Sequence, residues 1–136
     1  MSNIEQTLSI IKPDAVERNL TEEIKSIFLK NNLIVKNSKK IHITKEEAAE
    51  FYKVHQSKPF YSDLCAYLSS GPIIVMILEG DDAISMNRKV MGATDPKNAE
   101  ENTIRKLYGL SIDKNSVHGS DSVENAIKEI NFFFKN

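Results

Sequence analysis

The sequence predicts an α+β fold, a ferredoxin-like sandwich in which helices cover a four-stranded antiparallel sheet. Two βαβ halves follow one another along the chain, each with strand-type and helix-type apolar spacing in turn. All four prolines and all five glycines fall in the proposed turns and loops, which supports this division. A chain of 136 residues is long enough for one core and too short for two, so we expect a single domain over residues 1–136.

The chain begins with a strand and a helix. Residues 7–12 alternate in the manner of a strand, and the pattern stops at Pro13. A helix is predicted from Thr21 to about Asn31, because two acidic residues follow Thr21 and apolar residues then recur at helical spacing.

A second strand and two helices complete the first half. Residues 33–35 and 41–43 are apolar and flank a polar middle, which predicts one long or bulged strand. Thr44 and Glu47 have the spacing of a capping box, so a helix begins there. A short helical segment is expected after Phe60.

The second half starts with residues 73–78, an uninterrupted apolar run that is typical of a central strand buried on both faces. Residues 80–82 then start a helix with Met86 and Val90 on its core side, so that Arg88 projects away from the core.

A long polar stretch, residues 92–115, contains one helical turn at residues 101–108, and loops of this length are usually functional or disordered. A short strand leads into a last helix from about Asp121 to Phe134. The residues predicted to face inward from it are Val123, Ala126, Ile127 and Ile130.

Composition excludes several classes of protein. The net charge of −1 argues against a general affinity for nucleic acid or anionic membranes, which requires a basic surface. No apolar run approaches the length of a membrane span, and the first residues lack the pattern of a signal peptide. We therefore expect a cytoplasmic protein without membrane or specific nucleic-acid partners. The single cysteine, Cys65, lies in an apolar stretch and is expected to be a buried structural thiol.

His118 is the most informative candidate residue. It has no second histidine at metal-ligand spacing, which argues against a zinc site in this segment. Two interpretations stay open: a surface histidine beside a helix cap, or a group for acid–base chemistry or nucleophilic attack. Glu129, at the margin of the last helix's apolar stripe, is either a hydrogen-bond partner for this histidine or a solvated residue.

Other polar residues suggest a phosphate site. Arginine occurs only at positions 18, 88 and 105 in a lysine-rich chain, and arginine forks suit phosphate oxygens. Arg18 is also compatible with simple surface solvation. Phe60, between a proline and a tyrosine, offers either a stacking surface for a nucleobase or a plug under a loop. A polyphosphate site without a P-loop motif would use Lys12, Arg88, Thr94 and Arg105.

Short motifs spread over the chain form a collinear pattern. They are residues 7–16 (TLSIIKPDAV), 51–52 (FY), 58–60 (KPF), 70–72 (SGP), 87–88 (NR), 91–96 (MGATDP), 103–105 (TIR) and 115–122 (NSVHGSDS). With these motifs in this order, the chain resembles the nucleoside diphosphate kinase family along nearly its whole length. The segment around His118 is highly specific, and matches in separate segments reinforce one another.

The resemblance implies a ping-pong phosphotransfer. His118 would take the γ-phosphate of a nucleoside triphosphate, typically ATP, and the resulting phosphohistidine would pass it to a nucleoside diphosphate. Base specificity would be broad, because stacking tolerates any base. Mg²⁺ would be the cofactor and would arrive on the nucleotide phosphates rather than in a protein cage. The family also implies a homo-oligomer, a tetramer or a hexamer.

The resemblance also implies roles for individual residues. Arg88, Thr94 and Arg105 would bind phosphate oxygens, and Tyr52 would lie near the transferred group with Lys12. Lys12 and Asn115 would reach the ribose hydroxyls, while Phe60 would stack on the base. Ser120 and Glu129 would orient the imidazole of His118.

Four positions depart from the family pattern, namely Glu22, Val54, Asn102 and Leu107. Glu22 and Asn102 replace glycines, Val54 replaces an acidic residue, and Leu107 replaces an aspartate. None is an assigned substrate-binding position, so we expect activity to be retained. We expect Leu107 to pack against a loop or a neighbouring subunit.

Two alternatives from other classes remain at this point. A nucleotide sensor or nucleic-acid-binding module on the same sheet would not need His118, and it would favour exposed aromatic residues on its strands and a basic face. A phosphocarrier that accepts its phosphate from a protein would not need Phe60, Thr94 and Arg105 arranged for a nucleotide, and ATP would not label it.

Overall fold

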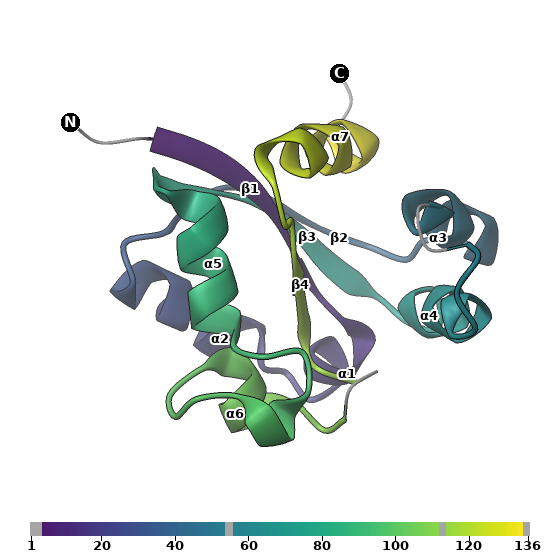
Figure 1. Cartoon of the computed structure of the whole chain (residues 1–136), viewed down its shortest axis with the longest axis horizontal. Helices are drawn as coiled ribbons and strands as arrows, with labels where there is room; N and C mark the ends of the chain where they lie inside the picture. Colours follow the sequence, from purple (N-terminus) through teal and green to yellow (C-terminus); the bar gives the residue numbers. More distant parts are fainter. Residues whose placement is uncertain (1–3, 54–55, 112–113, 135–136) are drawn as a thin grey trace.

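A four-stranded antiparallel sheet forms the centre of the structure, a computed structural model that describes residues 4–53, 56–111 and 114–134 (Figure 1). The strand order is β2-β3-β1-β4. The strands are β1 (Ile4–Ile11), β2 (Ile34–Ile41), β3 (Ile73–Asp81) and β4 (Val117–Gly119). The predicted α+β fold class is confirmed.

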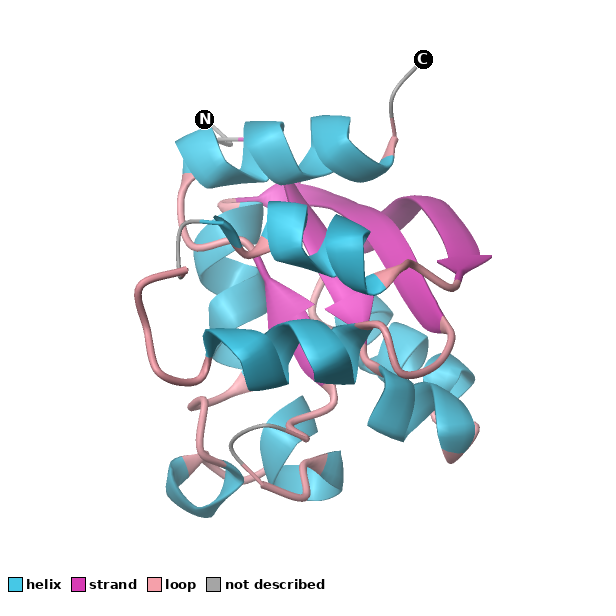
Figure 2. Ribbon diagram, turned by 90° about the vertical axis from the view of Figure 1, so that its right-hand side faces the viewer, coloured by secondary structure: helices cyan, strands magenta, loops and turns pink. Residues whose placement is uncertain are grey.

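Helices cover both faces of this sheet (Figures 1 and 2). One face packs against α1 (Pro13–Glu17), α2 (Thr21–Lys30), α5 (Ala83–Met91) and α6 (Ile104–Tyr108). The other face packs against α3 (Lys45–Phe51), α4 (Tyr61–Leu68) and α7 (Val123–Phe133). A short 3-10 helix, η2 (Pro96–Asn98), lies between α5 and α6.

The two-residue period of the strands explains how one sheet supplies two cores. In β3, Ile73 and Val75 belong to the core under α3, α4 and α7, whereas Ile74 and Met76 belong to the opposite core. Because β3 has strands on both sides and helices on both faces, every side chain from 73 to 76 is buried. The predicted central strand is thus confirmed, although it continues to Asp81 rather than ending before residue 80.

The edge strand β2 contains the predicted bulge. Its register against β3 shifts between Val35 and Asn37. The predicted capping box also forms: Thr44 Oγ1 accepts a hydrogen bond from the Glu47 backbone N–H at 3.0 Å, and Glu47 Oε1 accepts one from the Thr44 N–H at 2.8 Å. Cys65 is a buried free thiol, as predicted.

The inward face predicted for α7 is partly wrong. Ala126 is buried and Ile130 packs at the core margin, but Val123 and Ile127 are 55% and 58% exposed. The reason lies in the sheet: β4 ends at Gly119, opposite Ser9, so among the described residues the first half of β1 has a strand partner only on its β3 side, and its other edge lies open under the start of α7.

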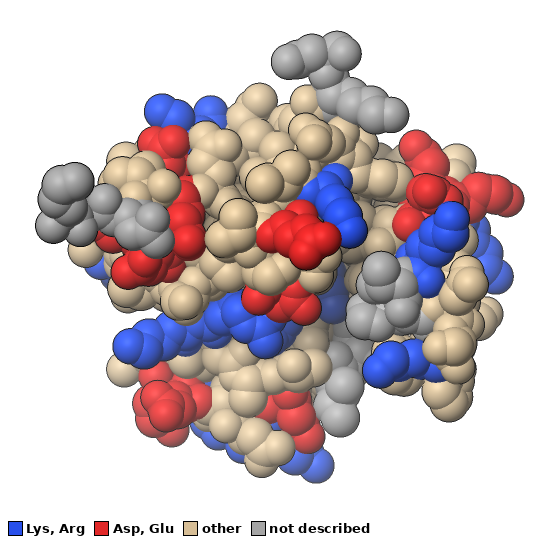
Figure 3. Space-filling view, turned by 45° about the horizontal axis from the view of Figure 1, so that its top comes forward, with Lys and Arg blue, Asp and Glu red and all other residues tan. Residues whose placement is uncertain are grey.

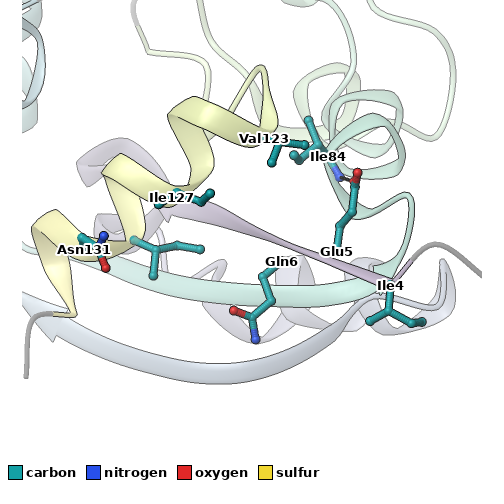
Figure 4. Close-up of a pocket in the computed structure, with 8 residues that line it drawn as sticks. Ile4, Glu5, Gln6, Ile84, Val123, Ile127 and Asn131 are labelled. Atoms are coloured by element: carbon teal, nitrogen blue, oxygen red, sulfur yellow. Dashed lines mark hydrogen bonds between the residues drawn. The ribbon is translucent and has the colours of Figure 1, made fainter.

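A shallow pocket of about 520 Å³ therefore opens between β1, α5 and α7 (Figure 4). Val123 and Ile127 approach it from α7, Ile4 from β1 and Ile84 from α5. Glu5 Oε1 accepts a hydrogen bond from the Ile84 N–H at 3.2 Å, which ties the start of β1 to the start of α5.

Two of the four departures from the family pattern, Asn102 and Glu22, fall at sites of low cost. Asn102 has φ of 69°, the left-handed region that glycine occupies freely and that asparagine tolerates better than most residues. Glu22 lies in the first turn of α2, where a negative charge is favourable. Leu107 is 52% exposed, so its predicted packing against a loop of this chain is wrong, while contact with a neighbouring subunit stays a prediction. Val54 lies outside the described residues.

Among the described residues, no helix combines the length and apolar character needed to cross a membrane.

Although the net charge is −1, lysine and arginine side chains gather in a band across one face, with acidic side chains on both sides of it (Figure 3).

Candidate active site

A pocket of about 730 Å³ lies where the ends of β1 and β4 meet α3, α4, α5 and α7. It brings together residues that are far apart in the sequence. Nine of the ten predicted site residues line it, namely Lys12, Tyr52, Phe60, Arg88, Thr94, Arg105, Asn115, His118 and Glu129. The tenth, Ser120, is buried behind Glu129.

His118 lies on β4 with its ring held on two sides. Its Nε2 atom is 3.1 Å from Oε1 of Glu129, which reaches it from α7. The ring of Phe51 packs edge-on against the imidazole, with ring centroids 5.3 Å apart. Neither of these two contacts involves the other ring nitrogen, Nδ1.

Ser120 connects this pair to the sheet. Its Oγ donates to Glu129 Oε1 at 2.7 Å, and the same Oγ accepts a hydrogen bond from the Leu8 N–H at 3.3 Å. The Ser120 N–H donates to the Leu8 carbonyl at 3.2 Å. Glu129 is therefore held by a group that β1 itself positions, and His118 is held by Glu129.

Lys12 and Asn115 form the inner wall of the pocket. Lys12 Nζ donates to Asn115 Oδ1 at 2.9 Å, and both side chains are buried. Asn115 Nδ2 donates in turn to the Thr94 carbonyl at 3.2 Å, so the end of β1 is linked to the loop after α5. A buried ammonium at this depth is suited to a negatively charged ligand.

Arg105 is fixed by backbone carbonyls. Its Nη1 donates to the Gly92 carbonyl at 3.0 Å, and its Nη2 donates to the Val117 carbonyl at 2.8 Å. Gly92 has φ of 89°, and a Cβ there would lie 2.5 Å from Thr103 Oγ1, so only glycine fits. Burial, together with the positive charge of Arg88, lowers the pKa of Arg105 to about 10, which leaves it charged at neutral pH.

Tyr52 is buried at the end of α3. Burial raises the pKa of its hydroxyl, and the negative charge of Glu129 contributes to the increase. The phenol is therefore a neutral donor at physiological pH.

Three residues mark the outer part of the pocket. Arg88 and Thr94 are exposed, and Phe60 is 44% exposed just before α4. This exposure is greater than a fully buried plug under a loop would have, and the stacking role of Phe60 stays a prediction.

Phe51 and Asp121 also belong to the site, although residue-level reasoning gave them no role there. The Asn125 side chain donates to Asp121 Oδ1 at 2.6 Å and lowers the pKa of Asp121, and the positive charge of Arg88 lowers it further. Asp121, Asn125 and Glu129 recur at intervals of four, so they lie on one face of the last helix and its start, a spacing visible in the sequence. No group of three or more His, Cys, Asp or Glu residues in the described ranges could hold a metal ion.

Comparisons with known proteins agree with this site. The family model for nucleoside diphosphate kinase matches residues 5–136. A nucleoside diphosphate kinase of Rhizorhabdus wittichii is 56% identical over 131 residues, covering 96% of this chain and 94% of the relative. One from Nitratiruptor sp. is 54% identical over 131 residues, covering 96% of each chain.

Solved structures show the same likeness. The crystal structure of the Aquifex aeolicus nucleoside diphosphate kinase has a TM-score of 0.96 at 40% identity, covering 98% of this chain and 97% of that one. That of the Encephalitozoon cuniculi nucleoside diphosphate kinase, in its apo form, has a TM-score of 0.93 at 39% identity, with 97% and 90% covered. The chain therefore belongs to the nucleoside diphosphate kinase family of enzymes.

Proposed function

We propose that this protein transfers the γ-phosphate of a nucleoside triphosphate, typically ATP, to a nucleoside diphosphate by a ping-pong mechanism through a phosphohistidine at His118. The observation that carries the proposal is the contact between His118 Nε2 and Glu129 Oε1 at 3.1 Å inside a pocket with buried cations. The family assignment and the names of its relatives support the same reaction.

The contact with Glu129 selects the nucleophile. A carboxylate accepts a hydrogen bond from Nε2–H, so the ring proton resides on Nε2 and the lone pair is on Nδ1. Nδ1 attacks the γ-phosphorus, the bond from that phosphorus to the β–γ bridging oxygen breaks, and the electron pair leaves with the nucleoside diphosphate. In the second half-reaction, the terminal phosphate oxygen of another diphosphate attacks phosphorus and the Nδ1–P bond breaks. Glu129 stabilises the positive charge that the ring carries while Nδ1 is phosphorylated.

The cations of the pocket neutralise the phosphates. Phosphoryl transfer requires positioning and charge stabilisation more than covalent chemistry. We assign phosphate contacts to Arg88, Thr94 and Arg105, and a contact near the transferred group to Lys12 and the neutral phenol of Tyr52. Two N–H groups of the Arg105 guanidinium already donate to backbone carbonyls, which holds the group rigidly in place for a phosphate.

The base would lie at the outer part of the pocket, and the ribose would lie nearer its inner wall. Lys12 and Asn115 reach the ribose hydroxyls, and the exposed ring of Phe60 stacks on the base. Stacking makes use of a π-face that every base has, so we expect broad base specificity.

Mg²⁺ is the expected cofactor, and the chemistry of the donor groups fits an ion carried mainly by the nucleotide phosphates. Three carboxylates line the pocket, those of Glu50, Asp121 and Glu129. Glu129 is engaged by His118 and Ser120, whereas Asp121 has a lowered pKa and remains ionised. Asp121 would therefore help to hold the ion. When bound, the ion neutralises phosphate charge and orients the chain of phosphates.

We also infer a homo-oligomer, a tetramer or a hexamer, in the cytoplasm. Exposed Leu29 on α2 and Ile34 on the edge strand β2 support contact with another copy, since open strand edges and exposed apolar side chains favour association. Light scattering of the purified protein at two concentrations tests this inference. A monomer at both concentrations contradicts it.

The reaction is tested by incubation with γ-labelled ATP and Mg²⁺, followed by a chase with unlabelled GDP. We expect an acid-labile, base-stable label on the wild type that is discharged into GTP, and no label on His118→Ala. A folded wild type that takes no label contradicts the proposal and favours a nucleotide sensor. A label that is not discharged into GDP favours a phosphocarrier instead.

A further inference from the structure

The buried carboxylate of Asp14 lies behind the active-site pocket, and none of the proposed steps uses it. Tyr67 donates its phenolic hydrogen to Asp14 Oδ1 in a short hydrogen bond, while the Asp14 N–H donates back to the same phenol oxygen at 2.9 Å. Ser116 Oγ donates to Asp14 Oδ2 at 3.0 Å, and Arg18 Nη2 donates to Oδ2 at 3.1 Å. One carboxylate thus accepts from three side chains.

These donors come from the segments that build the pocket. Asp14 follows Lys12 by two residues, and Ser116 lies between Asn115 and Val117, just before His118. The Lys12 N–H also donates to the Ser116 carbonyl at 2.8 Å. Asp14 is therefore two residues from Lys12, which directly follows β1, and Ser116 is two residues from His118 on β4.

The network also reaches the outer walls. Tyr67 belongs to α4, the helix that begins directly after Phe60. Arg18 Nη2 donates to the Tyr108 carbonyl at 2.6 Å, at the end of the helix that carries Arg105. The carboxylate of Asp14 thus connects four segments by hydrogen bonds: the start of α1, on which it lies, the loop before β4, helix α4 and, through Arg18, the end of α6.

The backbone at Ser116 points to a functional constraint. Its φ of 73° lies in the left-handed region, which is unfavourable for serine and persists only where the surroundings impose it. The Oγ bond to Asp14 and the carbonyl bond to Lys12 hold it there. The neighbouring Asn115 side chain is consequently directed at Lys12 Nζ, 2.9 Å away.

Loss of one donor would disturb the whole arrangement. A buried carboxylate requires hydrogen bonds to remain charged in the interior, and a missing donor leaves part of it unsatisfied. Burial and the hydrogen bond to Asp14 raise the pKa of Tyr67, so its phenol stays protonated and remains a donor. The carboxylate then shifts toward its remaining partners and takes Lys12 or Ser116 with it.

We propose that Asp14, Tyr67 and Ser116 are positioning residues that set the Lys12–Asn115 pair for the nucleotide. They touch no substrate themselves and act through the two strand ends on which Lys12 and Asn115 lie. The inference rests on the proposed function, because it assigns the nucleotide to this pocket.

The test compares Tyr67→Phe with Tyr61→Phe. Both variants remove one hydroxyl from α4, but the Tyr61 hydroxyl donates to the Ala49 carbonyl at 2.8 Å and has no part in the network. We expect Tyr67→Phe to raise the KM for GDP and the Kd for Mg·ADP about five- to tenfold, with kcat within about twofold of wild type. Tyr61→Phe should leave the Kd and KM unchanged.

Ser116→Ala provides a second test, because it removes another hydrogen-bond donor to the Asp14 carboxylate. In the double variant, the increase in the Kd for Mg·ADP should be smaller than the product of the two single increases, because both substitutions disrupt the same network. The proposal is overturned if Tyr67→Phe and Ser116→Ala lower the melting temperature but leave the Kd at the wild-type value. A wild type that binds Mg·ADP without phosphotransfer contradicts only the proposed function, and one that binds no nucleotide contradicts both.

Discussion

Glu129 Oε1 lies 3.1 Å from His118 Nε2 although the two residues are eleven positions apart and belong to different elements. The carboxylate also accepts from Ser120 Oγ at 2.7 Å, so it cannot turn away from the ring without losing two bonds. The orientation of the imidazole is therefore set by the packing of α7 across the end of β4.

Glu129→Gln preserves the shape of this contact but removes the negative charge that stabilises the phosphorylated ring. We expect the rate of His118 phosphorylation at saturating ATP to fall by roughly tenfold to a hundredfold, in the range that follows loss of one preorganised electrostatic contact. Single-turnover labelling with γ-labelled ATP measures it. Glu124→Gln is the matched control on the same helix, because Glu124 is exposed and pairs with exposed Lys128, and an equal loss there would contradict the role of Glu129.

Phe60→Ala removes the exposed ring at the mouth of the pocket. Because stacking on an aromatic ring contributes about 1–3 kcal/mol per base, we expect the KM for nucleoside diphosphates to rise roughly tenfold for purines and pyrimidines alike. The rate of phosphate transfer at saturation and the melting temperature should change little. Steady-state kinetics with GDP and CDP provide the measurement, and Phe60→Trp should restore the wild-type KM.

Gly92→Ala places a Cβ where Thr103 Oγ1 would be 2.5 Å away, on a backbone with φ of 89°. We expect the free energy of unfolding to fall by about 1–3 kcal/mol, because an L side chain is strained there whatever the space. Nucleotide affinity should fall as well, since the Gly92 carbonyl fixes Arg105. Gly71→Ala is the control for urea denaturation, as its Cβ would meet Pro13 at an ordinary 3.6 Å.

Asp121→Asn tests the lowered pKa of this carboxyl. A carboxyl whose folded pKa lies below its unfolded value of about 3.9 stabilises the protein above that pH, and the contribution is lost as the pH falls through the folded pKa. The urea midpoint of the variant should therefore lie below that of wild type at pH 7, by roughly a few tenths molar, and should approach it near pH 3. If the urea midpoints of the variant and the wild type differ equally at pH 7 and pH 3, the charge of Asp121 is not the cause of the difference.

The local elements follow from short-range chemistry and were accessible from the sequence. The capping box at Thr44 and Glu47 and the bulge in β2 each depend on a few neighbouring residues. The run of apolar residues in β3 reflects burial on both faces. The motif around His118 likewise identified the position of the candidate nucleophile.

Other features depend on which elements meet, and periodicity alone does not contain them. Val123 and Ile127 have the spacing of core residues, yet they are exposed because β4 ends opposite Ser9 and leaves the edge of β1 open beneath them.

The approach of Glu129 to His118 and the three donors around Asp14 also required the folded chain. By itself, the sequence indicated the family, the candidate polar residues of the site and the order of most elements, although it gave no sign of the short helix α1. The tertiary structure decided which of those residues are buried together, because contacts between distant segments are set by strand register and by the packing of helices on the sheet.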